Sequence, residues 1–429
     1  MSAYCKEEGR VDPAGPGAEK ITALLALAEE FRLRFAAGAP QRDRQRLLPH
    51  EEMLALRRSG LLAMRVPREF GGPEIDMVNF SRIIRMLAAG DPNIAQGIAP
   101  HFTNLEKLRI YGTPAQQRHY FDLVLEGCLM SNAAAEREGA FIGDVATLLF
   151  RENGVWRLRG NKYYSTGSLF SSIILVTAAH EEGGRAAVFV PVDRHGVTVV
   201  DDWDGMGQRT TSSGTSQFAD VEIAEEEILR IPAYGDRRTH EGGFAQLIHA
   251  SIDAGIARAA LEDACEYGRT SARVLRESGV RGAIEDPYVL HTVGEMAIIT
   301  HSAESLLERG AALLENAVQA AFAGGADADR LPSADGLPSA GRLPSADRLL
   351  GEASVAVAEA KYATTEAAIK VSEMIFRIGG ASATSGRLNL DRHWRNARTH
   401  TTHDPVAYKA RAVGDFYLNG ALPPINTKI

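Results

Sequence analysis

The sequence predicts a mostly helical α+β fold in which a central β domain lies between two helical domains. The chain has 429 residues, more than one hydrophobic core usually fills, so two or three domains with a shared interface are expected. Its hydrophobic pattern changes twice, from helical spacing to short β-branched runs and back again. We therefore expect a disordered tail at 1–17, an N-terminal helical domain at 18–125, a central β domain at 126–235 and a C-terminal helical bundle at 236–429.

The N-terminal helices are predicted from apolar residues that recur at intervals of three or four positions. ITALLALAEEFRLRFAAG and MVNFSRIIRMLAAGD both show this spacing, which is typical of amphipathic helices. We expect one face of these helices to enter the core, with the side chains of Leu24, Leu27, Phe31, Phe80, Ile83, Ile84 and Leu87.

The middle region contains short runs of β-branched and aromatic residues, among them VWRLRG, SIILVTAAH, RAAVFVPV and GVTVV. Gly, Asn and Asp residues separate these runs, as in the turns between strands, so the region is predicted to be a β domain. Helical spacing returns after Gly242 and continues through 286–323 and 349–378, which are long enough to pack as a bundle.

A repeat interrupts the C-terminal helices. LPSADG, LPSAGR and LPSADR follow one another from Leu331 to Arg348, and each Pro removes a helical hydrogen bond. We interpret 324–350 as a surface loop that grew by duplication, with partner docking as the alternative.

Composition excludes several classes of protein. With 45% hydrophobic and 24% charged residues the chain is typical of a globular protein, and its net charge of −8 does not support a nucleic-acid partner. Cys5, Cys128 and Cys265 have neither CxxC nor metal-ligand spacing, so no disulfide framework or zinc site is expected. A signal-peptide pattern and a run of about 18 apolar residues are both absent, so we expect a cytoplasmic protein without a membrane span.

The C-terminal segment FRIGGASATSGRLNLDRHWRNARTHTTHDP is the most specific part of the sequence. It resembles the acyl-CoA dehydrogenase superfamily, and within it the two-component flavin-dependent monooxygenases, typified by dibenzothiophene monooxygenase and sulfur-acquisition oxidoreductases. Residues 392–405 match the signature RxWRNxRTHTxHDP almost continuously, and the resemblance extends over about 20–420. It implies an acyl-CoA dehydrogenase-like fold with an N-terminal helical domain, a central β-barrel-like domain and a C-terminal four-helix bundle.

The same segment separates three functional hypotheses. Dehydrogenases of the superfamily commonly carry their catalytic Glu in a Tyr-Glu-Gly-Thr motif, where this chain has His403, Asp404 and Pro405. Asp404 is one methylene shorter than Glu and precedes a rigid Pro, which argues against abstraction of an α-proton. The resemblance thus favours a monooxygenase. An acyl-CoA dehydrogenase with FAD and Asp404 as base, or a non-catalytic binding or assembly protein, remains the alternative.

The resemblance implies that reduced flavin and O2 form a C4a-hydroperoxide, which oxygenates sulfur, nitrogen or an aromatic carbon of a small lipophilic substrate. Imidazoles suit this chemistry because they donate hydrogen bonds or protons near neutral pH. We expect His403 beside the flavin C4a, His400 in support and His101, at a helix start, facing the same pocket. The alternatives are polar core histidines and, for His101, a histidine bonded to backbone. A metal site at His400, His403 and Asp404 lacks a further ligand pair.

By the same resemblance, three residues of the β domain are candidate flavin ligands. Asn132 lies in SNAAAEREGAFIGD, and Ser165 and Thr166 lie in KYYSTGSLFSSIILV. Ser165 is also a candidate for binding the peroxide. Their alternative roles are those of ordinary loop and strand residues.

The cofactor is expected to be FMN, with FAD possible, because the Arg-x-x-Phe-Gly element that grips the FAD pyrophosphate in dehydrogenases has no clean counterpart. Arg273 is the candidate phosphate ligand, with a surface residue as its alternative. No GxGxxG motif stands between a strand and a helix, so a separate NAD(P)H-dependent flavin reductase would supply the reduced flavin. The family likeness also suggests a homotetramer in which the last helices build the subunit interface.

Overall fold

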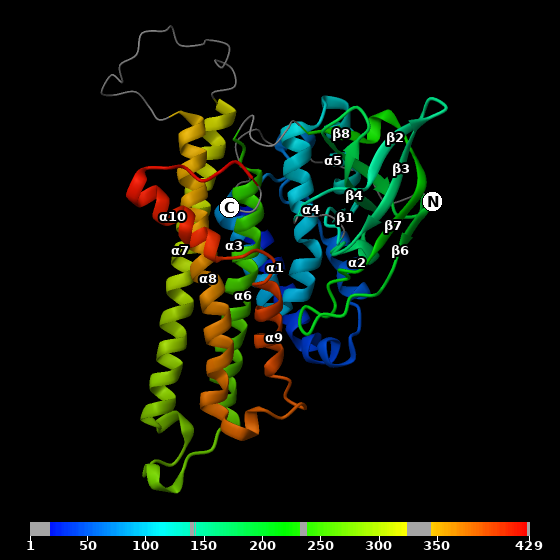
Figure 1. Ribbon diagram of the computed structural model, residues 1–429. Helices are drawn as coiled ribbons and strands as arrows, with labels where there is room; N and C mark the ends of the chain where they lie inside the picture. Colours follow the sequence, from blue (N-terminus) through cyan, green and yellow to red (C-terminus); the bar gives the residue numbers. More distant parts are fainter. Residues whose placement is uncertain (1–17, 138–140, 142, 232–237, 324–344, 427–429) are drawn as a thin grey trace, which may run out of the picture.

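The computed structural model describes residues 18–137, 141, 143–231, 238–323 and 345–426. The predicted tail and most of the LPSADG repeat lie outside these residues. Figure 1 shows the β domain at one side of the molecule, N-terminal helices beside it and a bundle of long helices at the other side. This arrangement confirms the predicted fold class.

The described part of the N-terminal domain contains five α-helices, of which the last three begin at side-chain caps. They are α1 (Ala18–Gln45), α2 (His50–Ser59), α3 (Met77–Gly90), α4 (Pro92–Tyr111) and α5 (Pro114–Leu125). The Asp76 carboxylate accepts the backbone N–H of Asn79 at the start of α3, and Asp91 accepts that of Asn93 at the start of α4. Asp91 is also the only residue between α3 and α4, and Arg42 of α1 binds its carboxylate at 2.8 Å. The direction of α4 is therefore fixed by two neighbouring helices.

Within the described residues, the β domain is one mixed sheet of eight strands. They are β1 (Met130–Ala133), β2 (Leu148–Glu152), β3 (Val155–Lys162), β4 (Ile173–His180), β5 (Arg185–Pro191), β6 (Val197–Val199), β7 (Ser216–Ile223) and β8 (Ile228–Arg230). The main path is β6-β7-β3-β2-β4-β5-β8, and β1 pairs in parallel with β4, with Met130 opposite Ile173. Since β1 also contacts α4, the sheet meets the helices at this strand.

The C-terminal bundle consists of long helices that pack side by side (Figure 1). They are α6 (Glu241–Thr270), α7 (Pro287–Ala323) and α8 (Ala346–Ala383), followed by α9 (Asp391–His400) and α10 (Ala407–Asn419), which pack against α8. The Ser345 side chain caps α8 by accepting the Arg348 backbone N–H, so this helix begins inside the third copy of the repeat.

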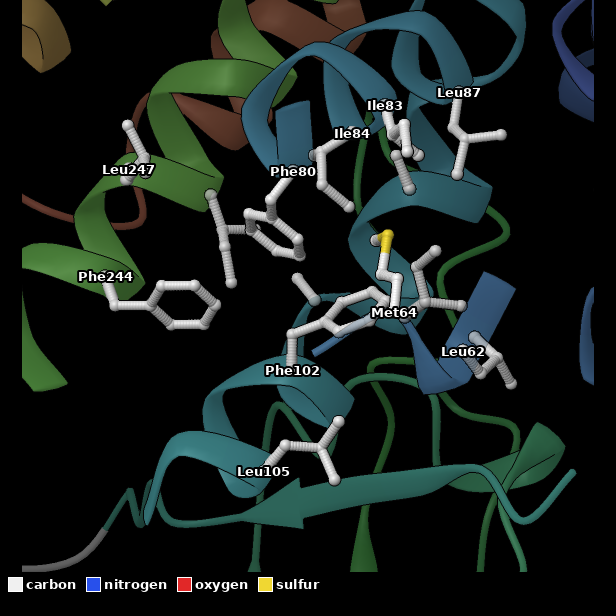
Figure 2. Packing of buried hydrophobic residues seen from close by; sticks show 14 of the residues in the cluster. Leu62, Met64, Phe80, Ile83, Ile84, Leu87, Phe102, Leu105, Phe244 and Leu247 are labelled. Atoms are coloured by element: carbon white, nitrogen blue, oxygen red, sulfur yellow. The ribbon is translucent and has the colours of Figure 1, made fainter. Parts of the chain in front are cut away.

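An aromatic cluster joins the N-terminal helices to the bundle (Figure 2). Phe80 of α3 meets Phe102 of α4 edge-on, with ring centroids 5.1 Å apart, and stacks on Phe244 of α6 at 5.0 Å. The predicted core residues agree with this packing. Leu24 and Leu27 are partly buried against the core, and the others are buried, namely Phe31, Phe80, Ile83, Ile84 and Leu87. The cluster holds α4 and α6 at a fixed distance, and both carry residues of the candidate site.

No helix in the described part of the chain is long and apolar enough to cross a bilayer.

Candidate active site

The end of α9 is fixed to the β domain by side-chain hydrogen bonds. The Asn396 Oδ1 accepts the Gln208 backbone N–H at 2.7 Å, and the Thr399 Oγ1 accepts the Gly207 N–H at 3.0 Å. An added Cβ at Gly207 would collide with the Arg395 carbonyl, so only glycine lets the two backbones approach this closely. His400, the last residue of α9, and His403, in the turn that follows, are therefore held in a defined position.

His400 is buried and paired with a buried carboxylate of α6. Its Nδ1 lies 2.6 Å from Asp253 Oδ1, while Asp253 Oδ2 accepts hydrogen bonds from Lys361 Nζ at 2.6 Å and Thr365 Oγ1 at 3.0 Å. Burial alone would raise the pKa of Asp253, but the charge of Lys361 and the hydrogen bonds from His400 and Lys361 lower it to about 2. Asp253 is thus ionised at neutral pH and accepts the Nδ1–H of His400.

The other ring nitrogen of His400 faces two polar side chains. Its Nε2 lies 3.1 Å from Nδ1 of His249, on α6, and 3.2 Å from Oε1 of Gln96, on α4. Burial lowers the pKa of both histidines, so both are neutral at pH 7. Neutral imidazoles have one donor and one acceptor nitrogen, and this lets them form a chain of hydrogen bonds.

His403 is the exposed member of the group. Its side chain is 42% exposed, and its Nδ1 lies 3.1 Å from Oδ2 of the buried Asp404, which also accepts a hydrogen bond from Gln246 Nε2 at 2.9 Å. The His403 and His249 ring centroids are 4.2 Å apart. The structure therefore brings the two predicted histidines together, with the third histidine, His249, between them.

The predicted flavin ligands of the β domain lie next to this group. Gly167 has a φ of +80°, and an added Cβ would collide with the carbonyl oxygen of Gly97, so the turn after Thr166 packs directly on α4 beside Gln96. The Thr166 hydroxyl bonds the Ser213 hydroxyl at 2.8 Å, whereas the buried Ser165 Oγ has no hydrogen-bond partner within the described residues. A buried hydroxyl without a partner is destabilising unless a ligand or water bonds it.

Asn132 is placed by α4. The Asn104 side-chain amide donates to the Ser131 carbonyl at 2.8 Å, and β1 continues to Asn132, which is partly buried. Together these contacts put Asn132 and Ser165 on neighbouring segments of the β domain, at its junction with α4 and α9. In the described residues, no group of three or more His, Cys, Asp or Glu side chains is arranged to hold a metal ion.

The sequence matches three acyl-CoA dehydrogenase domain models, namely the N-terminal domain at 19–127, the middle domain at 133–221 and the C-terminal domain at 247–407. It is 32% identical to the dibenzothiophene monooxygenase of Rhodococcus qingshengii over 418 residues, which cover 94% of each chain. The chain belongs to the acyl-CoA dehydrogenase family, in its monooxygenase branch. A probable FMNH2-dependent monooxygenase of Pseudomonas putida, SfnC, is 30% identical over 93% of this chain and 95% of its own.

Solved structures agree with this assignment of the monooxygenase branch. FMN-bound TdsC of Paenibacillus sp. A11-2 superposes with a TM-score of 0.84 at 30% identity, over 95% of this chain and all of TdsC. The methanesulfinate monooxygenase MsuC of Pseudomonas fluorescens gives 0.83 at 31% identity, over 94% and 99% of the two chains. Butyryl-CoA dehydrogenase of Megasphaera elsdenii, at 19% identity and a TM-score of 0.75, shares the fold. The predicted family, fold and class of flavin-dependent monooxygenase are thus confirmed.

His101 occupies a different position in this monooxygenase from the one that the sequence suggested. It lies inside α4, which continues through Pro100, and not at a helix start. Its Nε2 donates to the Leu62 carbonyl at 2.9 Å, and its Nδ1 accepts the Met130 backbone N–H at 3.1 Å. Both ring nitrogens are hydrogen-bonded to the backbone, as in the alternative given for His101 in the sequence analysis. These two bonds hold β1 against α4.

Arg273 also stands apart from the group. It is exposed and lies in the loop that follows α6. Its role as a phosphate ligand stays a prediction.

The sequence interpretation missed several members of the site. Gln246, His249 and Asp253 follow at intervals of three and four along FAQLIHASIDAG, which puts them on one face of an otherwise apolar helix. This spacing was a usable signal, because polar residues inside a buried helix need partners. Lys361 and Gln96 join the site through tertiary packing and have no comparable signal.

We predict that His101 makes the protein less stable in acid. Burial lowers the pKa of His101 from 6.5 to about 4. Below pH 6.5 the unfolded chain therefore binds a proton that the folded protein does not. The contribution of neutral His101 to the free energy of unfolding is fully present above pH 6.5. It is lost as the pH falls to about 4, and the total loss is about 3 kcal/mol. Urea unfolding of wild type and His101→Gln at several pH values measures it. Equal pH dependence in the two proteins would contradict this prediction, and His195→Gln, at an exposed turn, is the control.

Proposed function

We propose that this chain is the oxygenating component of a two-component monooxygenase, which uses reduced FMN and O2 to oxygenate sulfur, nitrogen or an aromatic carbon of a small lipophilic substrate. The observation that carries the proposal is the pair of histidine–carboxylate contacts at the end of α9, at the junction with the β domain. FMN is supported by the FMN-bound TdsC structure and the FMNH2-dependent relative SfnC.

The residues at this junction fit the polar edge of a flavin. The isoalloxazine ring carries hydrogen-bond donors and acceptors along its pyrimidine side, and the unpartnered Ser165 hydroxyl, the Thr166 hydroxyl and the Asn132 amide are of matching chemistry. When bound, reduced flavin supplies the two electrons that activate O2. One oxygen atom would enter the substrate and the other would leave as water, and the two hydrogens that the reduced flavin loses balance the two that the water gains.

His403 is the proposed proton donor to the leaving oxygen. Its Nδ1 contacts the Asp404 carboxylate, and Gln246 holds this carboxylate in place, so the ring is oriented for proton transfer. Its partial exposure lets His403 recover a proton from solvent. Behind it, the buried His400 and His249 rings exclude water from that side of the site.

The dehydrogenase alternative requires Asp404 to act as a base on an acyl substrate. In the structure, Asp404 is buried, and its Oδ2 is shared between Gln246 and His403. A carboxylate held in this way orients an imidazole, as in His–Asp pairs of other enzymes. This contact favours oxygenation over abstraction of an α-proton.

A separate NAD(P)H-dependent reductase would supply the reduced flavin. The two described cysteines, Cys128 and Cys265, are free thiols, which fits an enzyme of the reducing cytoplasm. The exposed position of Arg273 in the loop after α6 fits a phosphate contact made to a flavin in another subunit of a homotetramer.

The first prediction concerns catalysis. We expect the protein to bind reduced FMN more tightly than oxidised FMN or FAD. With reduced FMN and isotopically labelled O2, it should place one labelled oxygen atom in dibenzothiophene, indole or methanesulfinate, as judged by mass spectrometry. Tight FAD binding with anaerobic bleaching by an acyl-CoA would instead establish the dehydrogenase, and failure to bind any flavin would indicate a binding protein.

The second prediction concerns His403. Removing the proton donor in His403→Ala should lower oxygenation about 100-fold and divert O2 to hydrogen peroxide while the fold stays intact. The ratio of product to O2 consumed measures this effect. His195→Ala, at an exposed turn of the β domain, should keep the wild-type ratio. The same ratio in both variants would count against a role for His403.

The third prediction concerns assembly. Large apolar side chains of α7 face solvent in the single chain, with Tyr288 82%, Leu290 56% and Ile298 68% exposed. Such exposure is unusual for a monomer and supports a subunit interface. Light scattering should give four times the 46.3 kDa mass of the chain. A monomeric mass would refute the tetramer.

A further inference from the structure

We propose that His400 and His249 form a buried proton relay, held in place by Asp253 and Lys361, that ends at Nε2 of His249, and that His249 exchanges a proton with the oxygen that leaves the reaction. This inference rests on the proposed function for its last step, the delivery of the proton. The relay itself stands on the geometry of the buried side chains.

The relay is continuous across three helices. Lys361 of α8 contacts Asp253 of α6 at 2.6 Å, Asp253 contacts His400 of α9 at 2.6 Å, and His400 contacts His249 of α6 at 3.1 Å. All four side chains are buried, from 0% exposure at Asp253 to 8% at His249. Nε2 of His249 has no hydrogen-bond partner among the described residues, so the chain ends at a ring nitrogen that is free for a ligand.

The hydrogen bonds fix which nitrogen carries each proton. Asp253 can only accept, so neutral His400 keeps its proton on Nδ1, and its Nε2 accepts the Nδ1–H of His249. In this tautomer the Gln96 amide is turned so that its NH2 group, rather than its oxygen, faces the His400 Nε2. Nε2 of neutral His249 is then a base. When it takes up a proton, the Nδ1 proton of His249 can pass to Nε2 of His400, and the positive charge comes to rest beside Asp253.

In the direction of release, the Nε2–H bond of His249 breaks as an O–H bond forms on the leaving oxygen. The Nε2 proton of His400 moves to Nδ1 of His249, and His400 returns to its neutral form. Uptake reverses each transfer. One proton enters and leaves the relay, no electrons move within it, and the two hydrogens that the product water gains are balanced by the two that the reduced flavin loses.

Nearby charges decide when His249 takes up a proton. Burial lowers the pKa of His249, and His403, His400 and Lys361 lower it further, whereas Asp404 raises it. Gln96 of α4 and Gln246 of α6 add polar contacts without charge. The relay therefore rests neutral at pH 7, and a negative charge arriving beside His249 favours uptake of a proton.

His249 and His403 cannot readily both be cations. Their ring centroids are 4.2 Å apart, and two positive charges at this distance repel strongly where water is scarce. A proton on the exposed His403 thus keeps His249 neutral. Once His403 has given up this proton, His249 can take one up. The leaving oxygen takes two protons to become water, so the two histidine–carboxylate pairs would serve successive steps, with the first proton from His403 and the second from His249.

The chain offers a matched control for the test. His393 and Asp263 form a second contact between α9 and α6, with Nε2 to Oδ2 at 2.8 Å. The same Asp263 oxygen accepts a hydrogen bond from Arg392 at 2.7 Å. Asp263→Asn removes the negative charge of this pair without touching the relay, so it reports the structural cost of losing a histidine–carboxylate pair between the same helices.

The test of the relay uses NMR of isotopically labelled histidines in the flavin-free protein. We expect Asp253→Asn to move the titrations of both His400 and His249 to lower pH and to change the His400 tautomer. Asp263→Asn should change His393 only. If Asp253→Asn leaves the His249 titration at its wild-type position, the relay is refuted, whatever the enzyme oxygenates.

The test of proton delivery uses the oxygenation reaction with reduced FMN and O2, and measures the ratio of product to hydrogen peroxide. His249→Phe keeps an aromatic ring but removes the nitrogens that carry the proton. It should lower the ratio of product to hydrogen peroxide about 100-fold and abolish the dependence of this ratio on pH. His249→Gln is the second variant, in case the first does not fold. Wild-type coupling in a folded His249 variant would overturn the delivery role and leave the proposed function standing. A wild type that oxygenates no probe would overturn both.

Discussion

The buried carboxylate of Asp253 is the group on which the site depends. It binds Lys361 and Thr365 of α8 through one oxygen and His400 of α9 through the other, so it fixes three helices relative to one another. A buried charge is costly, and only complete pairing makes it tolerable. Loss of one partner from such a pair typically costs about 3–5 kcal/mol, because the other charge stays buried. The positions of α6, α8 and α9 are therefore coupled to the chemistry of one histidine.

A second constraint joins the helices to the β domain. Gly167 lies against the Gly97 carbonyl and Gly207 against that of Arg395, at separations that no side chain would allow. Each contact places backbone on backbone, so the β domain has little freedom to slide along α4 or α9. Ser165 and Thr166 are thereby held beside Gln96, and Gln96 contacts His400. The site is a junction whose parts come from all three domains.

Much of this arrangement follows from the sequence. Helical spacing placed Phe80 and its neighbours in the core, and the segment 392–405 indicated the family, because both signals are local. His101 was misplaced because Pro100 suggested a helix start. The proline lies within α4, which continues because a missing N–H costs one hydrogen bond and does not end a well-packed helix. Lys361 and Gln96 were missed because they meet His400 only when α4, α8 and α9 pack together.

The position of Asp404 shows how the same fold can support different chemistry. In this chain the carboxylate turns toward His403 and Gln246, and the neighbouring His400 has its own carboxylate from α6. Each imidazole is thus paired with an acid, one at the surface of the site and one inside it. Paired imidazoles can lend and recover protons near neutral pH, which a carboxylate alone does poorly because its ordinary pKa lies near 4. Replacing a lone base by two histidine–carboxylate pairs therefore suits the protonation of a leaving oxygen better than the removal of a proton from carbon.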